Sequence, residues 1–131
     1  MSAPRLDRLP PLTDNRAVAD STPSGAPIRQ LTPAELLALI GSAVPLEVVD
    51  VRTDHERALA QIEGSRLLDQ EYYEDLLRVG RTTPIVFVCH HGVWSQQAAE
   101  HFRREGFQNL SNLEGGIDAW SRLVDPSVPR Y

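Results

Sequence analysis

The 131-residue chain has a single cysteine and no lysine, since all 13 of its basic residues are arginine. One cysteine cannot form a disulfide within the chain. We therefore expect a fold that does not depend on an oxidising compartment, a thiol that is free for chemistry, and a cytoplasmic location.

Clustered positive charge and long apolar runs are also missing. The formal net charge is −5, and the arginines form no basic block. Nucleic acids and acidic membrane surfaces both bind clustered cations, so neither is expected as a partner. No apolar run approaches the length of a membrane span, and the first residues lack the apolar segment of a signal peptide.

The chain is long enough for one modest hydrophobic core. Residues 1–27 contain five prolines and no sustained periodicity, which predicts a disordered or loosely packed leader. Residues 28–131 are expected to form a single domain, and the protein is expected to be a monomer.

Apolar runs and helical patterns alternate from residue 28 onward. Strands are predicted at 28–31, 46–51, 66–69, 85–89 and 109–113. Helices are predicted at 33–41, 54–60, 71–79, 95–105 and 116–123. This alternation predicts an α/β fold with a mainly parallel five-stranded sheet and helices on both faces.

Local signals mark the ends and faces of several helices. Thr32 with Glu35, and Thr53 with Glu56, have the spacing of capping boxes. Apolar spacing assigns a shared inward face to a few residues of the first and last helical patterns, namely Leu36, Leu37, Ile40 and Ala43, and Ile117, Trp120 and Leu123. The prolines in residues 125–129 predict an extended tail.

Cys89 ends the apolar run 85–89, and a helical pattern follows a short loop. The carboxyl ends of parallel strands are where open α/β sheets bind ligands. Amides of the loop and of the next helix can hold an anion or favour a thiolate there, and Gly92 would let the loop curl. The alternative is that Cys89 merely fills the core.

Three segments, in order and spacing, resemble the rhodanese family of sulfurtransferases, which carry sulfur as a cysteine persulfide. They are the D-V-R of residues 50–52, the C-x-x-G loop of residues 89–95 and the L-x-G-G segment of residues 113–120. The match covers about residues 28–131. Residues 124–131 also resemble the ends of rhodanese domains fused to sulfur-carrier activating enzymes.

The resemblance implies a sulfurtransferase in which Cys89 cycles between thiolate and persulfide, with no cofactor. The sulfur donor would be thiosulfate or a persulfide, and the acceptor a thiol, cyanide or a protein. The substrate-binding loop would be His90, His91, Gly92, Val93, Trp94 and Ser95. Asp50 and Arg52 would support this loop indirectly, by pairing with each other or by bracing residues 61–65. The alternative is that Arg52 touches a donor anion directly.

Trp94 stands where active members of the family have Arg, so thiosulfate is expected to be a poor donor. Its indole either packs at the start of the helix or faces substrate. His90 and His91 are expected to point in different directions, and their adjacency lacks the spacing of a zinc site, so no metal is expected. Asp118 is interpreted as a partner of its helix dipole.

Two other function classes remain. A related phosphatase fold uses a cysteine loop one residue longer that ends in an arginine, which clamps phosphate. Only four residues separate Cys89 from Trp94, and the arginine is missing, so phosphatase activity is not expected. The second class is a catalytically weak rhodanese-like module that binds or regulates a partner protein.

Overall fold

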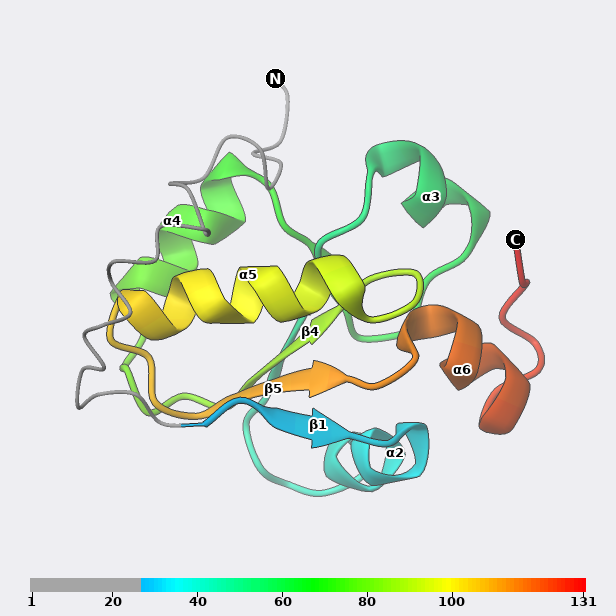
Figure 1. Ribbon diagram of the computed structural model, residues 1–131, viewed down its shortest axis with the longest axis horizontal. Coiled ribbons are helices and arrows are strands. Elements are labelled where there is room, and N and C mark those ends of the chain that lie inside the picture. The colour runs from blue at the N-terminus through cyan, green and yellow to red at the C-terminus, as the bar shows by residue number, and fades with distance from the viewer. Residues whose placement is uncertain (1–26) are drawn as a thin grey trace.

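The computed structural model describes residues 27–131, so the expected leader lies outside the described residues except for Pro27. Five strands form one sheet in the order β1-β5-β4-β2-β3 (Figure 1). They are β1 (Arg29–Leu31), β2 (Glu47–Asp50), β3 (Arg66–Leu67), β4 (Ile85–Val88) and β5 (Leu110–Leu113). Each strand pairs in parallel with its neighbours, which confirms the predicted sheet.

Helices cover both faces of this sheet, as predicted. They are α2 (Pro33–Ile40), α3 (Asp54–Leu59), α4 (Gln70–Arg78), α5 (Val93–Arg104) and α6 (Gly116–Leu123). Figure 1 shows α4 and α5 on one side and α2 and α6 on the other. The short α3 buries none of its residues. Among residues 27–131, no helix is both long and apolar enough to span a membrane.

Two capping boxes start helices where the sequence predicts them. The Thr32 hydroxyl accepts a hydrogen bond from the Glu35 backbone N–H at 3.1 Å, and the Glu35 carboxylate accepts one from the Thr32 backbone N–H at 2.8 Å. Thr53 and Glu56 make the same pair of bonds at the start of α3. These bonds satisfy backbone donors that a helix leaves unpaired at its first turn.

Strand β4 is central and buried on both faces. Ile85 and Phe87 point into a core cluster that includes Phe102 of α5. Val86 and Val88 point into the opposite cluster, which includes Trp120 of α6. The strand that leads to Cys89 is therefore fixed by apolar packing from both sides.

In two helices, the sequence predicts more inward-facing residues than the structure buries. Leu37 and Ile40 of α2 are 49% and 39% exposed, because the buried residues of this helix are only Pro33 and Leu36. Ala43, predicted on the same face, lies beyond the end of α2 and is exposed. In α6, Ile117 and Trp120 are buried as predicted, but Leu123 is 64% exposed. Val124, four residues after Trp120, packs against the core in its place.

The predicted extended tail is wrong in its local form. The Val128 backbone N–H donates to the Asp125 carbonyl at 3.0 Å, so Pro126 and Ser127 occupy the centre of a turn. Proline favours the second position of such turns. The turn buries Val128 in the core and directs Arg130 and Tyr131 back toward the start of α6 and the loop after β4.

Candidate active site

Cys89 is the first residue after β4, and backbone amides surround its sulfur. The Gly92 N–H donates to Sγ at 3.0 Å and the Ser95 N–H at 3.3 Å. Only 4% of the residue is exposed. These amide donors and the N-terminus of α5 place partial positive charge around this atom. A cysteine that merely filled the core would have its sulfur among hydrocarbon side chains only. The sulfur of Cys89 instead accepts hydrogen bonds from two backbone amides.

Gly92 provides the bend that brings these amides onto the sulfur. Its φ of 95° lies in the left-handed region, where a side chain is strained. A Cβ at this position would also lie 3.2 Å from the Gly115 nitrogen and from the Leu113 carbonyl oxygen. Helix α5 begins directly after Gly92, at Val93, which is two residues earlier than predicted.

A side-chain network adds a hydroxyl to the sulfur site. Ser95 Oγ lies 3.2 Å from Cys89 Sγ and donates a hydrogen bond to Asn112 Oδ1 on β5. The Asn112 amide group in turn donates to the Gly92 carbonyl at 3.1 Å and to Gln30 Oε1 at 2.9 Å. Asn112 therefore orients the serine and the loop backbone together.

Sequence reasoning did not identify Asn112 as part of the site. The signal was present, because Asn112 is a polar residue inside a strand whose four residues are all buried. A buried amide needs hydrogen-bond partners, and these partners lie in the loop after the neighbouring strand.

Asp50 and Arg52 form a buried pair on the neighbouring loop, as one of the predicted roles requires. Arg52 donates from Nε to Oδ1 at 2.9 Å and from Nη2 to Oδ2 at 2.7 Å. Burial alone would lower the pKa of Arg52, but the hydrogen bonds and charge of Asp50 outweigh it and raise the pKa overall, with a further contribution from Tyr131. The guanidinium is charged and fully occupied.

The remaining bonds of this pair hold the loops on either side of α3. Arg52 donates to the carbonyls of Glu56 and Ala60. Arg57, which sequence reasoning missed, donates to Asp50 Oδ2 at 3.0 Å and to the Ser65 carbonyl at 2.7 Å. The carboxylate thus braces the loop of residues 61–65 through Arg57.

His90 and His91 do not point in different directions, and this prediction is wrong. Their rings stack with centroids 4.0 Å apart and planes 29° from parallel. Tyr131 lies on the other side of His90, also with centroids 4.0 Å apart. The tail turn brings Tyr131 into this position, and nothing local to residues 89–95 predicts it.

Trp94 does not pack into the core. It lies in the first turn of α5 and is 56% exposed, and the preceding Val93 is 63% exposed. Of the two alternatives for Trp94, the packing role is therefore excluded. Two apolar side chains instead project to solvent beside the loop that holds the sulfur.

The start of α6 contacts the backbone of the same loop. The Ile117 N–H donates to the Cys89 carbonyl at 2.8 Å, and the Asp118 N–H donates to the His90 carbonyl at 3.1 Å. A hydrogen bond from Arg130, at 3.0 Å, lowers the pKa of the Asp118 carboxyl, with Arg122 contributing further. Asp118 therefore does more than interact with its helix dipole.

Comparison with known proteins gives consistent matches. The model of the rhodanese-like domain family matches residues 32–123. The thiosulfate sulfurtransferase GlpE of Pseudomonas paraeruginosa is 39% identical over 82 residues, which cover 62% of this chain and 74% of that protein.

A longer protein and a solved structure also match. The probable adenylyltransferase/sulfurtransferase MoeZ of Mycobacterium tuberculosis is 30% identical over 117 residues, covering 87% of this chain but 30% of that protein. The crystal structure of a rhodanese-like domain protein from Staphylococcus aureus has a TM-score of 0.63 and 28% identity, and it covers 79% of this chain and 99% of that one.

Proposed function

The chain belongs to the rhodanese-like domain family, which includes sulfurtransferases, and we propose that it transfers sulfane sulfur through a persulfide on Cys89. The observation that carries this proposal is the pair of backbone N–H groups, from Gly92 and Ser95, that point at Cys89 Sγ. They stabilise a sulfur anion without any metal or cofactor. Asn112 and Ser95 keep this geometry fixed before substrate arrives.

The reaction has two displacement steps. In the first, the Cys89 thiolate attacks the sulfane sulfur of the donor, an Sγ–S bond forms, and the bond between that sulfur and the rest of the donor breaks. The leaving group departs with the electron pair, as sulfite from thiosulfate or as a thiolate from a persulfide. In the second step, a thiolate or cyanide attacks the terminal sulfur, and Cys89 departs again as a thiolate.

The charges around the loop favour a persulfide donor over thiosulfate. Trp94 carries no charge to hold a sulfonate group, and the Arg52 guanidinium is already bound by Asp50. A persulfide brings one negative charge, which the loop amides receive at the reacting sulfur itself. The donor and the acceptor are the proposed partners. A reduced, single thiol suits the cytoplasm as the working compartment.

Intact-protein mass spectrometry tests this proposal. Incubation with glutathione persulfide should add one sulfur atom to the wild-type protein, and cyanide should remove it as thiocyanate. Cys89→Ala, the matched control, should gain no sulfur because the chain has no other cysteine. A folded wild-type protein that gains no sulfur from glutathione persulfide or thiosulfate would overturn the proposal.

One observation favours the second function class, a protein-binding module. Val93 and Trp94 are both more than half exposed next to the loop. Exposed apolar residues of this kind are typical of the centre of protein interfaces. The two functions are compatible when the sulfur acceptor is itself a protein. A module without catalysis would retain partner binding and fail the mass experiment.

A further inference from the structure

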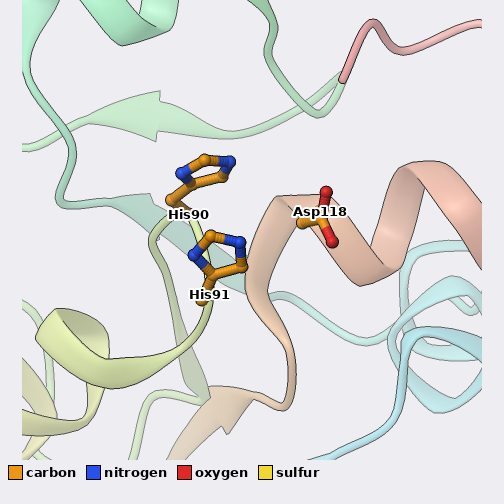
Figure 2. Close-up of side chains that lie close together, drawn as sticks. All are labelled: His90, His91 and Asp118. Carbon is orange, nitrogen blue, oxygen red and sulfur yellow. The ribbon is translucent and has the colours of Figure 1, made fainter. Parts of the chain in front are cut away.

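Two histidines and one aspartate meet at the rim of the Cys89 loop. His90 and His91 come from the loop after β4, and Asp118 comes from the first turn of α6 (Figure 2). One ring nitrogen from each histidine and one carboxylate oxygen lie within 4.8 Å of one another. In Figure 2 both rings have a nitrogen on the side that faces Asp118.

The spacing of these three atoms is close to that of a metal site. Ligand atoms at about 2.1 Å from one ion, at tetrahedral or right angles, lie roughly 3 to 3.5 Å apart. A contraction of at most roughly 1.3 to 1.8 Å from the present 4.8 Å therefore completes the site. His91 is exposed and would leave its stack on His90 to make this movement, whereas His90 is also held by its stacking on Tyr131.

The donor set selects a class of ion. Two imidazole nitrogens and one carboxylate suit zinc and its neighbours among the divalent transition metals, whereas calcium and magnesium prefer oxygen ligands alone. His90 Nε2 is enclosed and has no hydrogen-bond partner among residues 27–131. We propose that His90, His91 and Asp118 form a binding site for one divalent transition-metal ion.

Two arginines compete with the ion for Asp118. Arg130 Nε lies 3.0 Å from Oδ1, and Arg122 Nε lies 3.4 Å from Oδ2. Both arginines are close to half exposed and can turn into solvent. Removal of Arg130 should therefore strengthen metal binding. Nonspecific binding of the ion to surface histidines would not show this effect.

The sequence predicts no metal site because only residues close to each histidine along the chain were compared with the spacing of metal ligands. Asp118 lies 27 positions after His91, and the start of α6 brings it to the loop. Cys89 is not a member of the group. The site is therefore separable from the sulfur chemistry, and its test does not depend on the proposed transferase function.

The test measures Zn²⁺ binding by native mass spectrometry and isothermal titration calorimetry in the Cys89→Ala protein, which has no thiol to bind the ion. One Zn²⁺ per chain is expected. His91→Asn and Asp118→Asn should each weaken binding at least about tenfold, the loss typical of disturbing a metal site. His55→Asn, an exposed histidine on α3, is the matched control and should change nothing.

Arg130→Gln should bind Zn²⁺ several-fold more tightly than its parent. The proposal is overturned if the Cys89→Ala protein binds no Zn²⁺, if His91→Asn and His55→Asn bind equally, or if Asp118→Asn keeps full affinity. An unchanged affinity in Arg130→Gln would remove Asp118 as a ligand and with it the site as proposed.

Discussion

Tyr131 lies flat against His90, with ring centroids 4.0 Å apart and planes 9° from parallel. Its hydroxyl accepts a hydrogen bond from Arg52 at 2.9 Å and donates one to Glu56 at 3.2 Å. Burial raises the pKa of Tyr131 although Arg52 opposes this, so the phenol stays protonated at neutral pH. One side chain thereby joins the loop after β4 to the loop after β2.

Two replacements of Tyr131 should distinguish the contribution of its ring to stability from that of its hydroxyl. Tyr131→Phe keeps the stack and loses the hydrogen bonds, which should lower the free energy of unfolding by about 1 kcal/mol. Tyr131→Leu also loses the stack, which should lower the free energy of unfolding by about a further 0.5–1.5 kcal/mol. In NMR spectra, the ring-current shift of the His90 protons should persist in Phe and disappear in Leu. Equal shifts in both variants would contradict the stacked geometry.

Trp94→Arg should raise kcat/KM for thiosulfate more than for glutathione persulfide. The added guanidinium supplies the missing partner for the sulfonate group, and the exposed position tolerates the change. Trp94→Gln is the control, because it removes the indole without adding charge and should leave the ratio of the two donors near the wild-type value. A ratio that stays constant in the Arg variant would show that charge at this position does not limit thiosulfate use.

Ser95→Ala should speed alkylation of Cys89 by iodoacetamide near neutral pH, because the Ser95 hydroxyl donates its proton to Asn112 and turns only oxygen lone pairs toward the sulfur, while the amides remain in the variant. The unpaired Asn112 oxygen should cost about 1–3 kcal/mol of stability. Ser121→Ala is a matched control, since this serine is also buried but donates to the Val128 carbonyl, away from the loop. It should lower stability without changing the alkylation rate. Equal alkylation rates in the two variants would argue against a role for the Ser95 hydroxyl.

Gly116→Ala should be much more damaging than Gly64→Ala. Both glycines have positive φ, at 65° and 91°. A Cβ on Gly116 would collide with the His90 and Cys89 carbonyl oxygens, whereas a Cβ on Gly64 meets nothing within 4 Å.

Gly64→Ala should therefore cost only the backbone strain, about 1–2 kcal/mol. Gly116→Ala should add a displacement of α6 from the loop, seen as a larger fall in the urea midpoint and as faster alkylation of Cys89. Similar midpoints for the two variants would be incompatible with the close contact between α6 and the loop.

His101 should make stability depend on pH. It is buried and lies 3.0 Å from the Tyr73 hydroxyl. Burial lowers its pKa, Glu105 opposes this and Arg104 adds to it, with a net lowering. The unfolded chain therefore takes up a proton near pH 6.5, before the folded protein does. The stabilisation is complete above that pH, falls as pH drops toward the folded pKa and is constant below it.

Urea unfolding at a series of pH values measures this effect. Between pH 7 and 5, the wild-type protein should lose more stability than His101→Gln, whose side chain cannot take up a proton. Parallel pH profiles for the two proteins would show that His101 does not titrate differently on folding.

Features set by near neighbours along the chain could be predicted from the sequence. The capping boxes at Thr32 and Thr53 need partners only three residues away. The apolar run before Cys89 by itself indicates a strand that is covered on both faces of the sheet. The order of strands and helices then follows from their alternation. The loop amides at the sulfur were expected for the same reason, because Gly92 lies three residues from Cys89.

Features that join distant segments could not be predicted in the same way. The Tyr131 stack depends on the turn at residues 125–128, and the meeting of Asp118 with the two histidines depends on how α6 packs against the loop. The width of a buried helix face depends on how much sheet lies beneath the helix, which periodicity does not report. Leu123 is exposed although its spacing matches Trp120, and Val124 packs against the core instead.

The enclosed position of the single sulfur also determines how this chain responds to peroxide. A sulfenic acid at Cys89 has no second thiol in the chain with which to condense, so only a small thiol or another protein can return it to the working form. Only 4% of the residue is exposed, so that rescuer has to reach the same enclosed sulfur as a sulfur donor does in the proposed transfer. Occupancy by sulfane sulfur would keep the oxidant away from Sγ, and a protein at rest without donor is the form most easily lost to irreversible oxidation.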